Sequence, residues 1–377
     1  MSDIFLDTTL RDGEQQPGIS FARRDKLDLA KALDAWGVGV IEAGIPAMGR
    51  AERATLDQLH SLGLKAEILV WNRLTDADLD LCLAAGYPDL HFSVPASDIM
   101  LAGKVRRDRN WVLNQIDRVV GRAVAAGRRV SLGAEDSSRA DPAFLSEVFL
   151  RAQAAGASRV RFADTLGLLT PSRTTAFIAS LTQNLNVPLD FHAHNDFGLA
   201  TANTVAAFEA GARLLSCSLL GLGERAGNAA LEEVVGILTF LRPEPVKPDL
   251  VQKFPDLAGL CRLAAERAGI AVPAHKALVG EGVFSHQSGI HIDGLLKDAR
   301  TYEAWPPETF GGHRRLRFGK HSGPAALRHL AAERGVTVDE AEARIFLENL
   351  REKMGERAGV DPEAAFQALV IGRGGTP

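Results

Sequence analysis

Two residue types are scarce in this 377-residue chain: cysteine, with three copies, and tyrosine, with two. Cys82, Cys217 and Cys261 form no C-x-x-C pair, which argues against a disulfide framework and against a thiolate metal site. No run reaches the roughly 18 consecutive apolar residues of a transmembrane helix, and the first residues show no signal-peptide pattern. We therefore expect a soluble, cytoplasmic protein with no membrane partner.

An excess of either charge is also missing. The chain has 43 basic and 47 acidic residues, a net charge of −4 and a sequence pI near 6.2, so no overall basic field would attract nucleic acid. Hydrophobic residues make up 46% and charged residues 24%, which excludes a disordered or fibrous protein. The length fits two or three domains of roughly 150 residues, or one α/β barrel of about 250 residues plus a smaller domain.

What the chain has is a repeated strand–helix pattern. Eight short apolar runs are each followed by a segment of helical periodicity; they span residues 4–6, 38–41, 66–70, 90–94, 130–134, 159–163, 188–192 and 215–220. Eight such units predict an α/β fold, a (β/α)8 TIM barrel over residues 1–242. A doubly wound open sheet is the alternative. It usually has a glycine-rich phosphate loop after its first strand, and here residues 7–12 read DTTLRD.

Glycine is abundant, with 36 copies, and much of it follows the predicted helices. Gly37, Gly86, Gly127, Gly156 and Gly211 stand where a left-handed residue would end a helix.

Beyond the barrel the strand rhythm stops. We expect a linker and first helix over residues 243–270, with Pro243, Pro245, Pro248 and Pro255 in the linker. A mainly helical C-terminal region should follow over residues 271–377. One of its helices opens with a capping-box pattern at residues 337–340 and runs to about residue 354.

Polar residues stand at nearly every predicted carboxyl end of a strand, where barrel active sites lie. Any one of them alone is more often a helix cap or a solvated loop residue, but their joint occurrence favours a site. They are Asp7, Arg11, Asp12, Glu42, Asn72, Arg73, Glu135, Asp136, Asp164, Thr165, His192, His194, Asn195, Asp196, Glu224, Arg225 and Asn228.

The sharpest element is the pair His192 and His194. Residues two apart on a strand point to the same side, so both imidazoles should face the barrel mouth, where they suit a divalent metal. The third ligand would be a carboxylate, Asp12 or Asp7. The alternative is two histidines satisfied by hydrogen bonds in a polar mouth. Arg11 would stabilise an oxyanion beside the metal or form a salt bridge there.

Five motifs resemble those of the metal-dependent Claisen-condensing barrels, which are the isopropylmalate, homocitrate and citramalate synthases. They are DTTLRDGEQ at residues 7–15, HAHND at 192–196, GLGERAGN at 221–228, FSHQSGIH at 284–291 and GKHSG at 319–323. Within that family, the chain is most similar to the short homocitrate synthases associated with nitrogen fixation.

The resemblance implies condensation of acetyl-CoA with a 2-oxo acid, here 2-oxoglutarate, followed by thioester hydrolysis to homocitrate and CoA. The implied metal ligands, for one Mg, Mn or Zn ion, are Asp12, His192 and His194. The implied catalytic residues are Arg11, Glu135 and His291, the last reaching the active site of the partner in a homodimer. The implied substrate-binding residues are Gln15, Glu42, Ser93, Thr165 and Asn228, with the last also beside the metal.

The chain departs from the family pattern at two places. Some members have a catalytic tyrosine before the GKHSG motif, but residues 310–318 contain none, so that role is vacant, filled by Tyr302, or passed to His313 or His321. The arginine that lysine-pathway homocitrate synthases carry after the fourth strand is not evident either, and we expect Ser93 and Ser97 to line that side. A basic run, Arg314, Arg315, Arg317 and Lys320, suits CoA phosphates or is a solvated surface.

Three other functions stay open on the sequence. The same chemistry with 2-oxoisovalerate or pyruvate would make the protein an isopropylmalate or citramalate synthase. A lyase of the hydroxymethylglutaryl-CoA type would run the reverse cleavage, but such lyases carry a Gly-Cys-Pro loop in which Cys217 does not sit. A metal-binding scaffold without activity is the third.

Overall fold

The structure is a computed structural model that describes residues 4–244, 246–247 and 249–376. The chain divides into two compact units, residues 1–272 and 273–377, and each is described by itself. In the described residues, no helix is long and apolar enough to span a bilayer.

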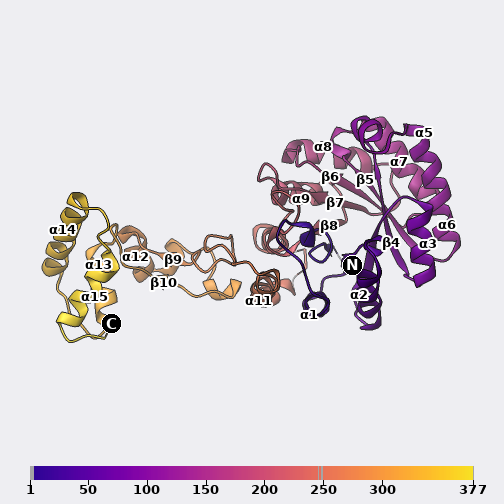
Figure 1. Ribbon diagram of the computed structural model, residues 1–377. Helices are drawn as coiled ribbons and strands as arrows, with labels where there is room; N and C mark the ends of the chain where they lie inside the picture. The colour runs from indigo at the N-terminus through magenta and orange to yellow at the C-terminus, as the bar shows by residue number, and fades with distance from the viewer. Residues whose placement is uncertain (1–3, 245, 248, 377) are drawn as a thin grey trace. The chain divides into compact units, whose positions relative to one another are not determined.

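Eight parallel strands form a closed barrel in the first unit, in sequence order, with β8 pairing with β1 (Figure 1). The strands are β1 (Phe5–Asp7), β2 (Val40–Gly44), β3 (Glu67–Arg73), β4 (Asp89–Pro95), β5 (Arg129–Glu135), β6 (Arg159–Asp164), β7 (Leu189–Ala193) and β8 (Leu214–Cys217). The predicted barrel is confirmed, and each predicted apolar run overlaps one strand. The eighth predicted run, residues 215–220, extends beyond the end of β8 at Cys217, because residues 219–221 form a 3-10 turn in which Leu220 has a positive φ.

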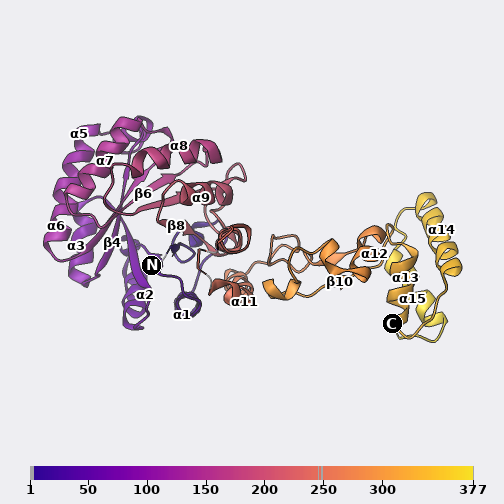
Figure 2. The ribbon, with the colours of Figure 1, turned by 180° about the vertical axis from the view of Figure 1, so that it is seen from behind.

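Helices surround the barrel in both views (Figures 1 and 2). They include α1 (Arg23–Trp36), α2 (Arg50–Ser61), α3 (Asp76–Ala85), α4 (Asp98–Met100), α5 (Arg109–Gln115), α6 (Gly121–Ala125), α7 (Pro142–Ala154), α8 (Pro171–Thr182), α9 (Ala200–Glu209) and α10 (Leu231–Gly236). The five glycines predicted to end helices all have φ between 76° and 117°, so their predicted conformation is confirmed.

Helix α11 (Leu250–Ala268) belongs to the first unit and packs against α1. The indole Nε1 of Trp36 donates to the Lys253 carbonyl at 3.1 Å, which ties the two helices together. Pro255 lies inside α11, so placing it in the linker was wrong. Pro255 is the sixth residue of α11 and has no N–H, so the Val251 carbonyl lacks the usual helical hydrogen bond from this position. Pro245 and Pro248 lie outside the described residues.

The second unit is mainly helical, as predicted, and adds two short parallel strands that the sequence did not predict. It contains β9 (Ser285–His286), β10 (Arg315–Leu316), α12 (Gly289–Lys297), α13 (Pro324–Glu333), α14 (Glu340–Glu356) and α15 (Pro362–Gly372). Phe318, Leu347 and Phe366 belong to its hydrophobic core, to which α13, α14 and α15 all contribute buried residues; Figure 1 shows these three helices near the C-terminus. The capping box of α14 joins Asp339 to Glu342, two residues later than predicted, since the Asp339 carboxylate caps the Glu342 N–H.

The amino ends of four neighbouring strands carry a set of ion pairs, which we call the base ion pairs. The Arg129 guanidinium binds both oxygens of Asp89 and lies 3.1 Å from Glu67, and Arg159 lies 3.1 Å from the other Glu67 oxygen. These four residues are the first residues of β5, β4, β3 and β6. The base ion pairs therefore close the end of the barrel opposite to the one where the predicted site residues gather.

Candidate active site

Three potential metal ligands meet at the carboxyl end of the barrel. His192 is on β7, His194 follows two residues later, and Asp12 lies in the loop after β1. The Asp12 Oδ2 atom is 3.1 Å from His192 Nε2 and 3.8 Å from His194 Nε2, and the two Nε2 atoms are 3.2 Å apart. One carboxylate oxygen and two imidazole nitrogens, all within 4.8 Å of one another, form a group suited to a divalent metal.

Protonation and packing prepare these groups for a cation. Burial opposes the charged form of Asp12, but Arg11 and the hydrogen bond to His192 outweigh it and hold the Asp12 pKa well below its usual range. Burial and the adjacent His192 lower the pKa of His194 to about 3, so this imidazole is neutral at pH 7. Asn228 donates to Asp12 at 3.0 Å, while its buried Oδ1 has no hydrogen-bond partner among the described residues. The residues present fit a metal ion.

Asp7, the alternative carboxylate, is not in this group. It is fully buried, and both its oxygens accept hydrogen bonds from Thr9. Burial raises the pKa of Asp7 to about 7. Asp7 therefore supports the loop after β1, whereas Asp12 reaches the histidines.

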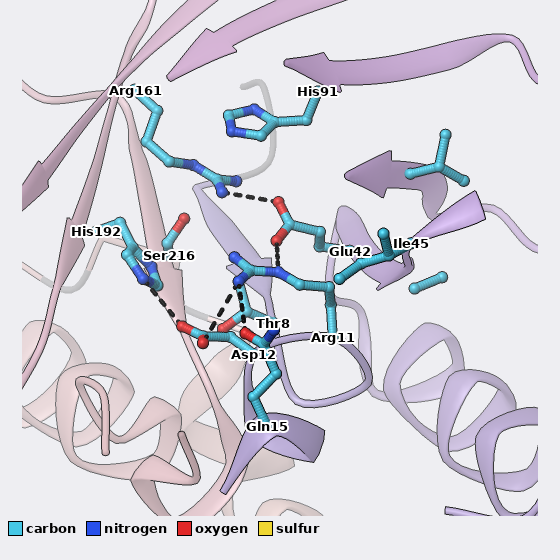
Figure 3. A network of polar contacts seen from close by, with 12 residues as sticks. Thr8, Arg11, Asp12, Gln15, Glu42, Ile45, His91, Arg161, His192 and Ser216 are labelled. Atoms are coloured by element: carbon cyan, nitrogen blue, oxygen red, sulfur yellow. Dashed lines mark hydrogen bonds and ion pairs between the residues drawn. The ribbon is translucent and has the colours of Figure 1, made fainter. Parts of the chain in front are cut away.

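A chain of buried ion pairs runs beside the three ligands. Glu42 lies between two guanidinium groups, with one oxygen on Arg11 and the other 2.7 Å from Arg161 (Figure 3). The two arginines hold the pKa of Glu42 well below its usual range despite its burial. Arg161 continues to Asp190 at 2.5 Å, and Asp190 accepts from the Ser216 hydroxyl. Arg11 also approaches Asp12 at 3.4 Å, so the predicted salt bridge forms beside the candidate metal group.

A cavity of about 220 Å³ opens onto this group. Its lining contains most of the predicted site residues of the barrel: Arg11, Asp12, Gln15, Ser93, Glu135, Thr165, His192 and His194. Glu42 and Asn228 are not in the lining but hold Arg11 and Asp12 from behind. Ser97 is not in the lining either. Its hydroxyl caps α4 and donates to Asp136, so the expectation that Ser97 lines the cavity was wrong.

The sequence did not single out several cavity residues: Trp71, His91, Lys104, Gly133 and Arg161. A signal for two of them existed, since His91 and Arg161 precede Ser93 and Ala163 by two positions and so share their side of the strand. A Cβ on Gly133 would lie 2.7 Å from the His91 imidazole, so this strand position leaves room for that ring. Burial and Arg161 lower the His91 pKa well below 6.5.

Other polar residues at the strand ends are structural. Asp164 accepts hydrogen bonds from two backbone N–H groups in its own loop, and Asn195 accepts from the N–H of Ala200. Asn72 donates to backbone carbonyls, and Arg73 pairs with Asp78. The loop explanation therefore holds for Asp164 and Asn195, while Asn72 and Arg73 make structural contacts from within β3.

Glu135, at the end of β5, is held by one side chain in particular. The Lys104 ammonium lies 2.7 Å from each Glu135 oxygen. Lys104 belongs to a π-helical turn, η3 (Leu101–Val105), which ends at Arg106 with φ 53° and ψ 51°. This left-handed conformation is unfavourable for a residue other than glycine, so the turn that carries Lys104 is locally strained.

In the second unit, the exposed His291 lies on α12 and stacks on Tyr302, with ring centroids 4.2 Å apart. Burial lowers the pKa of the neighbouring His286. Of the basic run, Arg314 forms a bidentate pair with Glu303, and Arg315 lies 3.8 Å from Glu281.

Comparisons with known proteins agree with these features. The family described as HMGL-like matches residues 3–265, and the one described as Homocitrate synthase post-HMGL domain-like matches residues 278–358. A homocitrate synthase of Frankia sp. (strain FaC1) is 45% identical over 348 residues, covering 92% of this chain and 85% of the relative. A 2-isopropylmalate synthase 2 of Caldanaerobacter subterraneus subsp. tengcongensis is 42% identical over 346 residues, covering 92% and 89%.

Among solved structures, hydroxymethylglutaryl-CoA lyase from Pseudomonas aeruginosa matches with a TM-score of 0.60 at 20% identity. The match covers 72% of this chain and 94% of the lyase. At this identity the likeness concerns the barrel fold alone.

Proposed function

The chain belongs to the HMGL-like family, and from this premise we propose that it is a homocitrate synthase that condenses acetyl-CoA with 2-oxoglutarate. The observation that carries the proposal is the convergence of Asp12, His192 and His194 beside Arg11, in a cavity lined by further cations. A 2-oxo acid offers a carboxylate and a keto oxygen, and both suit a metal and a guanidinium group.

Asp12, His192 and His194 would hold one Mg, Mn or Zn ion. When bound, such an ion supplies a Lewis acid for a keto oxygen. Arg11 would donate to the same developing oxyanion, and its ion pair with Glu42 supports this role by holding the guanidinium beside Asp12. The Asn228 amide donates a hydrogen bond to Asp12 Oδ2 at 3.0 Å and so helps to fix the carboxylate.

The condensation requires removal of a proton from the acetyl methyl group. We assign this role to Glu135 together with the partner subunit's His291, because a carboxylate or an imidazole can accept a proton near neutral pH. The carbon left with the electron pair forms a bond to the keto carbon, whose oxygen takes up a proton. Water then attacks the thioester carbonyl, and CoA leaves as the free thiol.

The acceptor is assigned from the charge of the cavity. Arg11, Lys104 and Arg161 line it, and a distal carboxylate is favoured over a branched apolar group among such side chains. Gln15, Ser93 and Thr165 add hydrogen-bonding groups to the substrate pocket. An isopropylmalate synthase is the second candidate, favoured by the 42% identity to a relative of that name.

The test is release of free CoA thiol from acetyl-CoA with divalent metal and a panel of 2-oxo acids. We expect 2-oxoglutarate to give the highest kcat/KM. A preference for 2-oxoisovalerate or pyruvate would overturn the acceptor, and no release with any 2-oxo acid would overturn the function.

The proposal includes a cytoplasmic homodimer in which each second unit serves the partner's barrel, a CoA site near the basic run, and a role in nitrogen fixation. Mixing two inactive variants, His291→Ala and His192→Ala, tests the exchange of His291 between subunits. Each mixed dimer has one intact site out of two, so mixed dimers should have about half of the activity of wild-type dimers. An equal mixture of the two variants should therefore regain about a quarter of the wild-type activity. Mixed dimers that stay inactive would contradict the shared site.

A further inference from the structure

We infer that Lys104 selects the acceptor and, by moving from Glu135 to the acceptor's distal carboxylate, releases Glu135 for proton removal. This inference rests on the proposed function and deepens it, because it names the group that recognises a dicarboxylate acceptor. It starts from the ammonium of Lys104, which lies 2.7 Å from both oxygens of Glu135 and lines the same cavity as the candidate metal group.

The other cations of the cavity are committed to fixed partners. Arg161 is 2% exposed and is held by Glu42 and Asp190, so turning it would remove an ion-pair partner from two buried carboxylates. Arg11 is fixed by Glu42 as well. Arg225 binds both oxygens of Asp196 and the Thr165 carbonyl.

Lys104 differs from these arginines in exposure and in number of partners. Its side chain is 56% exposed, and Glu135 is its one ion-pair partner among the described residues. An ion pair in contact with solvent contributes little net stability, so the Lys104–Glu135 pair can exchange for a pair with a substrate carboxylate at small cost. The flexible stem of lysine permits the movement, whereas the backbone of Glu135 is fixed by the hydrogen bond from the Ala96 N–H at 2.9 Å.

The pairing has a consequence for proton removal. The Lys104 ammonium occupies the lone pair that faces it on each Glu135 oxygen, so a methyl proton can use these two lone pairs only after the Lys104 hydrogen bonds are displaced. A 2-oxo acid with a distal carboxylate would draw Lys104 away, while an acceptor with an apolar end would leave the pair intact. Proton removal is thereby coupled to the presence of the correct acceptor.

The experiment compares wild-type enzyme with Lys104→Met and Lys104→Arg. Arg107→Met is the matched control, because it removes an equal charge from the same loop at an exposed residue that does not line the cavity. For Lys104→Met, we expect the ratio of kcat/KM for 2-oxoglutarate to that for pyruvate to fall about 10- to 100-fold, the effect of removing one charged hydrogen bond. Lys104→Arg should recover most of the ratio, and Arg107→Met should keep it.

A second measurement follows exchange of the acetyl-CoA methyl protons with deuterium oxide in the absence of any 2-oxo acid. Glutarate, a dicarboxylate without a keto group, should accelerate exchange in the wild type by about tenfold or more. Lys104→Met should exchange at the accelerated rate with or without glutarate.

Two results would overturn the inference while the wild type is active: an unchanged acceptor ratio in Lys104→Met, whether or not both activities fall together, or glutarate-independent exchange in the wild type. Failure of the proposed function has a different signature, since the wild type itself would then fail to release CoA or would prefer another acceptor.

Discussion

The two ends of the barrel both carry charged side chains, but they pair them differently. At the amino ends of β3–β6, the base ion pairs join two arginines to two carboxylates on neighbouring strands. At the carboxyl ends, the Asp12 carboxylate is approached by Arg11 and by the ring nitrogens of two histidines. The buried Asn228 Oδ1 beside them has no hydrogen-bond partner among the described residues. At the amino ends, the charged side chains pair with one another. At the carboxyl ends, metal-ligating atoms of Asp12, His192 and His194 lie close together, where a ligand can bind.

This difference in pairing distinguishes charged residues that stabilise the fold from charged residues that bind a ligand. A buried polar atom without a partner costs free energy, so a group of them persists where a ligand supplies the missing interactions. At the base, each charged group has an opposite charge beside it, so no ligand is needed to balance charge, although the buried Arg159 Nε has no hydrogen-bond partner among the described residues. Substitutions at the two ends should therefore affect different properties, activity at one end and stability at the other.

The largest effect is expected at the ligand end. His192→Ala should reduce CoA release by about 10³-fold or more and weaken binding of the divalent metal, because one of three ligands is lost. Isothermal titration with metal and the thiol assay measure both effects. The metal-free stability should change little. If His192→Ala unfolded instead of only losing its metal, the proposed difference between the two ends of the barrel would be contradicted.

Asp7 can be compared directly with Asp12, because it lies only five residues away but supports the loop after β1 and does not reach the histidines. Its pKa is raised by burial from 3.8 to about 7, so its contribution to stability is fully present below pH 4 and is lost as the pH rises through about 7. This difference between the Asp7 pKa in the unfolded and the folded protein corresponds to about 4 kcal/mol of the free energy of unfolding. Urea unfolding should show this fall between pH 4 and 8 in the wild type, and Asp7→Asn should remove it. An equal slope in both proteins would contradict the assignment.

Arg11→Lys keeps the charge but loses the planar fork that spans Glu42, Asp12 and Gln15. We expect kcat to fall by about 10²-fold, the usual effect of one oxyanion donor, with metal affinity nearly unchanged. Steady-state kinetics with metal in excess measure this. Full activity in Arg11→Lys would place Arg11 among the structural ion pairs.

The smallest effect is expected at the base. Arg129→Met should lower the free energy of unfolding by about 1–2 kcal/mol, because Asp89 is 3% exposed and loses its bidentate partner. The kcat and the metal affinity should be those of the wild type. A change in metal affinity from this substitution would show that the two ends are coupled.

The sequence alone was sufficient for the barrel, because its strands and glycine helix ends are set by local patterns. It also placed His192 and His194 together, since alternation along a strand is a local property. It could not choose between Asp7 and Asp12, because the choice depends on how the loop after β1 folds. For Arg161, alternation along the strand indicates the side of the strand but not the partners, because Glu42 and Asp190 come beside it only in the folded barrel.

The most direct test of the central claim measures CoA release from acetyl-CoA and 2-oxoglutarate by metal-depleted protein during titration with a divalent metal. We predict no release without metal, full recovery at one ion per chain, and no recovery in the double variant His192→Ala, His194→Ala. Release of CoA by the metal-depleted protein or by the double variant would contradict the account.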